Sequence, residues 1–188
     1  EYRQRFNNGE LDFSGSLARA DRDVGSPNIS ETKEDEIRGH VFAKGQFDLD
    51  ETWRTGFDIN RSSDQSYLRK FGFWGRGGNS LTSNAYVEGF RHRSYAAANL
   101  YSFQDLRSGQ RDDPPYILPL LDYNGLGETD RYGGRWSLDA NFRHLRREDT
   151  ADSVRTSVNG GYRVPVTADA GYVTTFSAGM RADLYRLS

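Results

Sequence analysis

Three histidines are the residues of this chain whose type best suits metal binding or proton transfer. His40, His92 and His144 are far apart in the sequence, and the chain contains no cysteine. Zinc sites usually take their histidines and cysteines in pairs only a few residues apart, so this spacing does not match a metal site. We therefore expect the three histidines to lie on polar strand faces or in turns, in contact with solvent.

Acidic clusters are the second candidates for chemistry. Residues 21–25 (DRDVG) begin like a calcium-binding loop but lack its third acid and its distal glutamate. The pair Asp112 and Asp113, and the group Asp48, Asp50 and Glu51, stand in turn-like sequence, where acids commonly form turns. We find no phosphate-binding glycine loop and no G-x-S-x-G motif. The sequence thus predicts no catalytic residue, no metal, no cofactor and no enzyme activity.

The clearest pattern is a strict alternation of apolar and polar residues over residues 36–71. Odd positions from Ile37 to Leu49 are apolar or small, while even positions are polar or charged except for Phe42. After the short connection 50–52 the alternation resumes from Trp53 to Ser62. A period of two residues predicts two strands with one apolar and one charged face. Their length exceeds the five or six residues usual in soluble sheets and suits membrane-spanning strands.

Composition sets further bounds. The chain has 188 residues and a net charge of −2, which argues against nucleic-acid binding. It contains no run of 18 apolar residues, so no transmembrane helix is predicted, and its mean hydropathy of −0.83 does not exclude a barrel with a polar lumen. Its one methionine is Met180. We interpret residues 1–188 as one partial β-barrel domain, an interior slice of a larger barrel.

Similar alternation along the rest of the chain predicts an all-β fold, an antiparallel up-and-down meander of about ten long strands with no helix. We expect a long polar loop at 21–35, a long connection at 61–80 and loops at 108–115 and 125–131. The predicted strands cover residues 2–6, 11–17, 37–49, 53–62, 81–90, 95–106, 116–124, 132–144, 154–164 and 172–184. Short and long connections alternate over the first half, which is how a transmembrane outer-membrane β-barrel is built.

Aromatic residues gather beside the short connections. Phe6, Phe47, Trp53, Phe90 and Tyr95 flank the first three, and Tyr123, Tyr132, Tyr162 and Tyr172 flank the later ones. This favours an interfacial aromatic girdle. The alternative is that aromatic residues simply favour strands.

The alternation assigns residues to two environments, because a charge facing lipid at mid-bilayer costs about 2–4 kcal/mol. The predicted lipid-facing belt comprises Val41, Phe47, Trp53, Phe57, Ile59, Tyr132, Trp136, Tyr162, Tyr172 and Phe176. The predicted lumen-facing residues are Arg38, Lys44, Arg54, Asp58, Arg135, Asp139, Arg143, Arg155 and Arg163.

Several stretches together resemble a known family. The most specific is W-R-x-G-F-D at 53–58 followed by S-D-x-S-Y-L at 63–68. Three further stretches add to the resemblance: LTSNAYVEGFRHRSYAAANLYSFQDLRSG, PPYILPLLDYN and RYGGRWSLDANFRHLRRED. They are similar to the barrel part of the LptD family, the lipopolysaccharide-assembly or organic solvent tolerance proteins, over about 37–185.

The resemblance implies a large antiparallel barrel in the Gram-negative cell outer membrane that delivers lipopolysaccharide (LPS) to the outer leaflet. It implies LPS and outer-membrane lipid as ligands, and an LptE-type lipoprotein plug in the lumen. It also implies a periplasmic LPS-bridge protein, reached through a jelly-roll domain outside these 188 residues. No gate residue of the family maps onto this sequence.

Three other readings stay open. The chain suits a small outer-membrane barrel or a porin-like channel, since eight to ten strands can close on themselves. A secreted all-β binding module is disfavoured by the strand length and the charged second face. An outer-membrane lipase lacks support because no serine and histidine have motif spacing.

Overall fold

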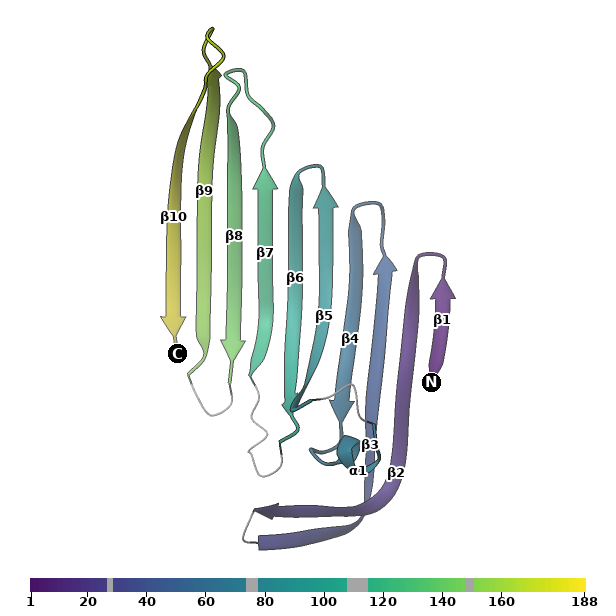
Figure 1. The fold of residues 1–188 in the computed structure, drawn as a ribbon. Coiled ribbons are helices and arrows are strands. Elements are labelled where there is room, and N and C mark those ends of the chain that lie inside the picture. The colour runs from purple at the N-terminus through teal and green to yellow at the C-terminus, as the bar shows by residue number, and fades with distance from the viewer. Residues whose placement is uncertain (27–28, 74–77, 108–114, 148–150) are drawn as a thin grey trace.

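The computed structural model contains a single antiparallel sheet of ten strands, in which each strand pairs with its neighbours in the sequence (Figure 1). It describes residues 1–26, 29–73, 78–107, 115–147 and 151–188. The predicted up-and-down meander is confirmed. The strands are β1 (Tyr2–Phe6), β2 (Gly9–Ser26), β3 (Ile29–Asp48), β4 (Trp53–Ser62), β5 (Ser80–Arg91), β6 (Ser94–Asp105), β7 (Tyr116–Leu126), β8 (Arg135–Arg146), β9 (Ser153–Thr167) and β10 (Val173–Leu187).

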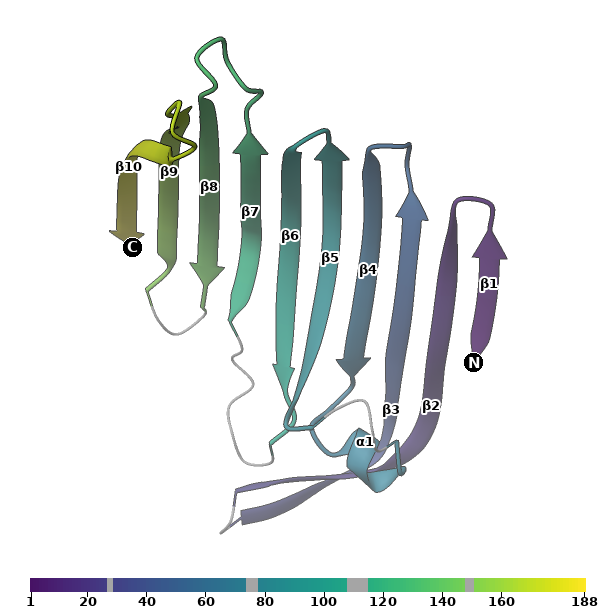
Figure 2. The same cartoon turned by 45° about the horizontal axis from the view of Figure 1, so that its top comes forward.

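The sheet is open, with β1 and β10 at its two edges (Figure 2). Apart from the 5-residue β1, the strands have 10 to 20 residues. Strands of this length match or exceed the 9–11 residues or so that cross a bilayer. Two strands begin after a residue of the predicted belt: β8 begins at Arg135 and β10 at Val173, so Tyr132 and Tyr172 lie in the preceding turns.

The connections lie on two rims (Figure 1). One rim, here called the short-turn rim, carries the turns β1–β2, β3–β4, β5–β6, β7–β8 and β9–β10. The opposite rim, the long-connection rim, carries the other four. The predicted connection 61–80 belongs to the second rim and contains a helical turn, α1 (Tyr67–Lys70), where no helix is predicted from the sequence.

The prediction of a polar loop at 21–35 is wrong, because β2 and β3 continue through it as a paired ribbon beyond the rim (Figure 1). Charged residues pair across this ribbon: Arg19 lies 3.6 Å from Asp35, and Arg22 lies 3.7 Å from Glu36. These charge pairs stand where the other strands carry an apolar face, so the composition of the ribbon resembles that of a loop. The ribbon bends at a bulge between Ala20 and Arg22.

A seam separates β4 from β5 near the long-connection rim. Backbone pairing of these strands runs only from Trp53–Gly89 to Asp58–Asn84. Beyond these pairs, the side chain of Gln104 on β6 forms the hydrogen bonds that a neighbouring strand would form with Ser62. The Ser62 amide donates to Gln104 Oε1 at 3.0 Å, and Gln104 Nε2 donates to the Ser62 carbonyl at 2.7 Å. Both residues are buried, so this amide completes the hydrogen bonds of β4 where β5 does not reach.

A small hydrophobic core lies under α1. It explains Phe42, the one apolar residue at an even position of 36–48, which is only 4% exposed. Because α1 covers this end of the charged face, the aromatic ring of Phe42 is buried rather than presented to water. The core consists of Phe42, Tyr67, Leu68, Leu81 and Leu106.

Candidate functional site

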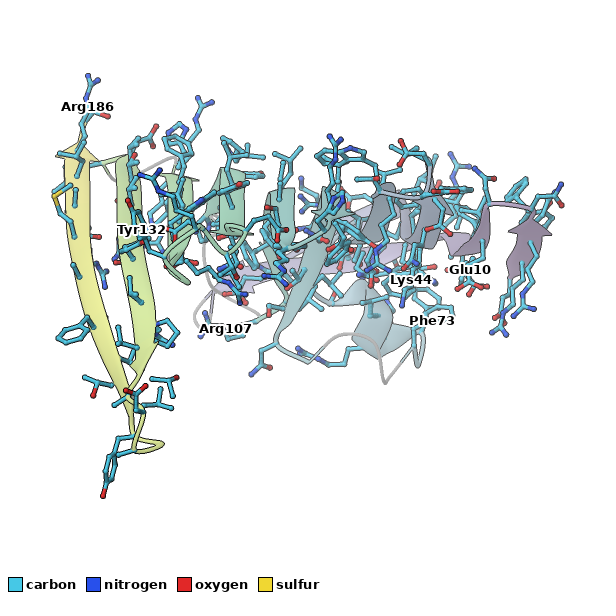
Figure 3. All side chains as sticks on the ribbon, turned by 90° about the horizontal axis from the view of Figure 1, so that it is seen from above. Glu10, Lys44, Phe73, Arg107, Tyr132 and Arg186 are labelled. Atoms are coloured by element: carbon cyan, nitrogen blue, oxygen red, sulfur yellow. The ribbon has the colours of Figure 1, made fainter. Side chains whose placement is uncertain are left out.

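The register of the sheet divides the strand residues into two faces. Paired residues in an antiparallel sheet point to the same side, and the pairs connect one strand to the next across all ten. In Figure 3, Glu10, Lys44 and Phe73 lie on one side of the sheet. We call this side the polar face. It carries Arg38, Lys44, Arg54, Asp58, Arg135, Asp139, Arg143, Arg155 and Arg163, all nine of the predicted lumen-facing residues.

The other side, the apolar face, carries most of the predicted belt. Its strand members from the belt are Val41, Phe47, Trp53, Phe57, Ile59, Trp136, Tyr162 and Phe176. The remaining two, Tyr132 and Tyr172, are exposed in turns of the short-turn rim. Large side chains on this face are accessible, with Trp136 at 48%, Phe176 at 63% and Met180 at 78%. A contiguous apolar surface spread over many strands marks a surface that meets lipid or protein.

Aromatic rings on the apolar face lie over glycines of the neighbouring strand. A Cβ added to Gly45 would lie 2.9 Å from the Phe57 ring, and one added to Gly89 would lie 2.7 Å from the Trp53 ring. Both glycines are directly opposite these rings in the register. The rings therefore lie flat along the sheet and cover the backbone with apolar surface.

Tyr162 ties the apolar face to the short-turn rim. Its hydroxyl donates to Asp130 in the β7–β8 turn, and the amides of Tyr132 and Gly134 donate to the same carboxylate at 2.8 and 2.9 Å. The hydrogen bond from Tyr162, aided by the two amides, lowers the pKa of Asp130. A ring on the apolar face with its hydroxyl at the rim is the arrangement typical of an interfacial girdle.

Two girdle predictions are wrong. Phe90 and Tyr95 pair with each other on the polar face, because they share the side of Arg54 and Glu88. Arg54 Nε donates to Glu88 Oε1 at 2.6 Å, and the Tyr95 hydroxyl donates to Glu88 Oε2 at 2.9 Å. The Arg54 guanidinium also lies 5.2 Å from the centre of the Phe90 ring. Both rings therefore contact the Arg54–Glu88 ion pair, and the alternation of the sequence does not predict this contact.

Polar networks continue across the last strands. Asp139 accepts hydrogen bonds from the amides of Asn124 and Asn159. On β9 and β10, Asp183 accepts from Ser157, lies 3.4 Å from Arg155 and lies 2.8 Å from Arg181. The polar face is thus a wall of hydrogen-bonding and ionic groups rather than a packed core.

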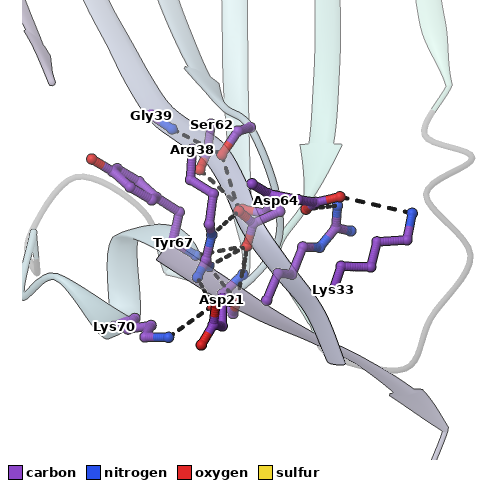
Figure 4. Close-up of polar contacts among 12 residues, drawn as sticks. Asp21, Lys33, Arg38, Gly39, Ser62, Asp64, Tyr67 and Lys70 are labelled. Carbon is purple, nitrogen blue, oxygen red and sulfur yellow. Dashed lines mark hydrogen bonds and ion pairs between the residues drawn. The ribbon is translucent and has the colours of Figure 1, made fainter. Parts of the chain in front are cut away.

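The most enclosed polar group is the ion pair of Arg38 and Asp64, shown in Figure 4. Arg38 Nε and Nη2 donate to the two carboxylate oxygens at 2.8 and 2.9 Å. Asp64 also accepts from the amides of Ser66 and Tyr67, at 2.8 and 2.9 Å, and from the Ser63 hydroxyl. Burial favours a raised pKa for Asp64, but the hydrogen bonds from Arg38, Ser66 and Ser63 outweigh it and hold the pKa well below its usual range.

This ion pair explains the motif at 63–68. Asp64 accepts a hydrogen bond from the amide of Tyr67, the first residue of α1, as Asp side chains commonly do just before a helix. Arg38 Nη2 also donates to the Ser66 hydroxyl at 2.8 Å. Arg38 and Lys70 both donate to the carbonyl of Asp21, where the ribbon bends (Figure 4). From the sequence, residues 63–68 are predicted only as part of the long connection 61–80. The S-D-x-S spacing indicates a turn, but it does not reveal the partner of Asp64, because Arg38 lies 26 residues earlier in the sequence.

The candidate chemical residues are dispersed. His40 is buried beside Ser16 and the rings of Phe42 and Phe73, so the expectation of solvent contact is wrong for it. His144 lies 3.6 Å from Asp152, and His92 lies in the β5–β6 turn.

Asp50 accepts from the amides of Thr52 and Trp53, as a turn former does. Asp112 and Asp113 lie outside the described residues. No group of three or more potential ligands among histidines, cysteines and acids occurs in the described part of the chain.

Comparison with known proteins agrees with this architecture. Within the described residues, no helix has the length and apolar character needed to cross a bilayer. No curated protein matches the chain. The family model described as LptD, LPS transport system D, matches residues 36–188, which is most of the sequence. The chain therefore belongs to the LptD family of LPS transport proteins.

Proposed function

We propose that this chain forms part of the wall of an outer-membrane β-barrel that delivers LPS to the outer leaflet. Family membership supports a role in LPS transport. The finer assignment depends on one observation, the separation of the strand residues into an apolar and a polar face across ten strands. In this proposal the apolar face contacts membrane lipid and the polar face lines the lumen.

The two rims support an orientation for this wall. Outer-membrane barrels have short turns on the periplasmic side and longer loops outside. The short-turn rim is accordingly periplasmic, and the rim with α1 and the β2–β3 ribbon faces the exterior. LPS would then pass along the polar face toward α1.

We extend the proposal to partners. A lipoprotein plug of the LptE type would contact the polar face inside the lumen, where it would form hydrogen bonds with the networks around Asp139 and Asp183. A periplasmic LPS-bridge protein would approach from the short-turn rim, through a domain outside these residues. The protein acts as a conduit rather than as an enzyme, and binds its substrate through surface charge.

A porin-like channel is the competing function, since its wall has the same two faces. The position of α1 favours LPS delivery over an open pore. The helical turn is packed onto the polar face by a buried core and a buried ion pair, so one end of this face is covered.

Depletion of the complete protein in cells tests the proposal and separates the two functions. Newly made LPS at the cell surface is measured with an externally added enzyme that modifies lipid A, and the purified protein is assayed for ion conductance in planar bilayers. We expect surface arrival of LPS to stop on depletion and to return with the wild-type gene. Normal LPS arrival after depletion, together with a steady conductance, would instead establish a porin.

A further inference from the structure

Two arginines face each other on the polar face near the short-turn rim. Arg135, the first residue of β8, is directly opposite Arg163 on β9. Side chains paired in this way have Cβ atoms about 4.5–5.5 Å apart, and like charges at such positions destabilise a sheet. The Arg135 guanidinium donates to the Thr129 hydroxyl at 2.9 Å. Within the described residues, neither arginine forms an ion pair.

Several other arginines of the polar face have acidic neighbours. Arg54 contacts Glu88 at 2.6 Å, and Arg155, which is opposite Arg143, contacts Asp183 at 3.4 Å. The other opposed pair of arginines, Arg143 and Arg155, thus has an acid beside it, whereas the Arg135–Arg163 pair has none within the described residues. An uncompensated pair of cations is the arrangement expected of a site whose anion comes from a ligand.

The two arginines line a hollow of about 590 Å³. The next row of the sheet toward the long-connection rim consists of Ser137, Gly161 and Gly179, which are paired across β8, β9 and β10. These are the smallest side chains available, and a Cβ on Gly161 would already lie 2.9 Å from Ser137 Oγ. The backbone therefore forms the floor of the hollow.

The chemistry of the lining matches a tetrahedral anion. Thr129, Ser137 and Ser177, which carry hydroxyl groups, line the same hollow as the two arginines. Leu126 and Pro165 also line it. Guanidinium groups present paired N–H donors that fit phosphate oxygens two at a time. Asp139 lies two residues beyond Ser137 on the same face, where the amides of Asn124 and Asn159 hold its carboxylate.

We propose that the hollow between Arg135 and Arg163 binds a phosphate group of LPS. This inference rests on the proposed function, because it takes the polar face as the surface that meets LPS. The position of the site at the short-turn rim makes it an early contact for LPS entering from the periplasmic side. Binding there holds the phosphorylated part of the molecule against the wall before it moves outward.

The experiment compares binding of two probes to the complete protein in lipid nanodiscs. One probe is purified LPS, and the other is the same LPS with its phosphates removed by hydrofluoric acid. Hydrogen bonds to charged groups contribute more than neutral ones, so we expect wild type to bind phosphorylated LPS about tenfold more tightly. The Arg135→Gln, Arg163→Gln double variant should bind both probes equally.

A matched control removes another arginine from the same face without changing net charge. The Arg54→Gln, Glu88→Gln double variant should keep the full preference for phosphorylated LPS, because that ion pair is already compensated. The Arg135→Gln, Arg163→Gln variant should also unfold at the same or a higher urea concentration than wild type, since it removes a repulsion. This second readout separates loss of a site from loss of the fold.

Three results overturn the proposal. A double variant that keeps the preference excludes these arginines, and equal binding of both probes by wild type excludes phosphate recognition while leaving LPS binding intact. Competition by phosphatidylglycerol vesicles as strong as that by LPS would assign the hollow to membrane phospholipid. Failure of wild type to bind either probe would instead contradict the proposed function itself.

Discussion

Arg38 on β3 and Asp64 in the β4–α1 connection form a two-point ion pair in which both side chains are only 1% exposed. This contact joins the sheet, the helical turn and, through the Asp21 carbonyl, the bend of the β2–β3 ribbon. The long-connection rim is thus organised around one buried charge pair.

Replacement of Asp64 by asparagine should destabilise the protein by about 3–5 kcal/mol, because it leaves the buried Arg38 guanidinium without its counter-charge. The urea midpoint of the protein in lipid vesicles measures this. An Arg38→Met, Asp64→Leu double variant should recover most of the loss, since no buried charge then remains. Asp12→Asn, which removes the exposed partner of Arg3, is the control, and an equal cost for the two variants would contradict the role of the buried pair.

The same pair predicts the response to acid. A carboxyl group whose pKa is lowered on folding stabilises the folded state above its unfolded pKa, about 3.9 for Asp, and that stability is lost as pH falls toward the folded value. We expect α1 to stay docked from pH 7 to about pH 4 and to loosen only in stronger acid. Exchange of the Tyr67 amide hydrogen, corrected for its intrinsic rate, reports this. Undocking between pH 6 and 5 would show that Asp64 lacks the lowered pKa.

On the apolar face, a glycine that lies under an aromatic ring should tolerate substitution by alanine less well than a glycine with open space beside it. Gly89→Ala should destabilise the sheet by about 1–3 kcal/mol, because the new Cβ would lie 2.7 Å from the Trp53 ring. Gly160→Ala is the matched control on the same face, where nothing lies within 4 Å of the added atom. Urea unfolding in vesicles compares them, and equal midpoints for the two variants would show that the Trp53 ring does not occupy this space.

The seam between β4 and β5 predicts an unusual role for a glutamine. Gln104→Leu leaves the amide and carbonyl of Ser62 without partners in a buried setting, which should cost about 1–3 kcal/mol. Gln46→Leu, at an exposed amide, should have little effect. Hydrogen exchange at the Ser62 amide should rise in the first variant alone, and unchanged protection there would contradict the bridging role.

Much of the fold follows from local pattern. Alternation predicts the strands, their antiparallel order and the two faces, because side chains alternate across a strand wherever its two environments differ. It fails for the β2–β3 ribbon, where cross-strand charge pairs such as Arg19–Asp35 and Arg22–Glu36 replace the apolar pattern. It also fails for Phe42 and His40, since α1 and the segment before residue 74 cover part of the polar face.

The sites depend on contacts between distant residues. Asp64 and Arg38 are separated by 26 positions, so their pairing is visible only once β3 and β4 are in register. Phe90 and Tyr95 look like girdle residues because they flank a short turn, but the parity of β5 and β6 turns them toward Glu88. A one-residue difference in register decides the face, and apolar and polar residues alternate too irregularly over 81–90 and 95–106 to show it.

The central claim is that the apolar face meets lipid and the polar face meets water. Val158 and Asn159 are adjacent in β9 and belong to opposite faces, and these 188 residues contain no cysteine to interfere with labelling. Nitroxide labels at Val158→Cys and Asn159→Cys in the complete protein in bilayers should differ in accessibility. We predict that the label at 158 collides with oxygen and that the label at 159 collides with a water-soluble nickel complex. The reverse result, or equal access of the nickel complex to both labels, would contradict the claim.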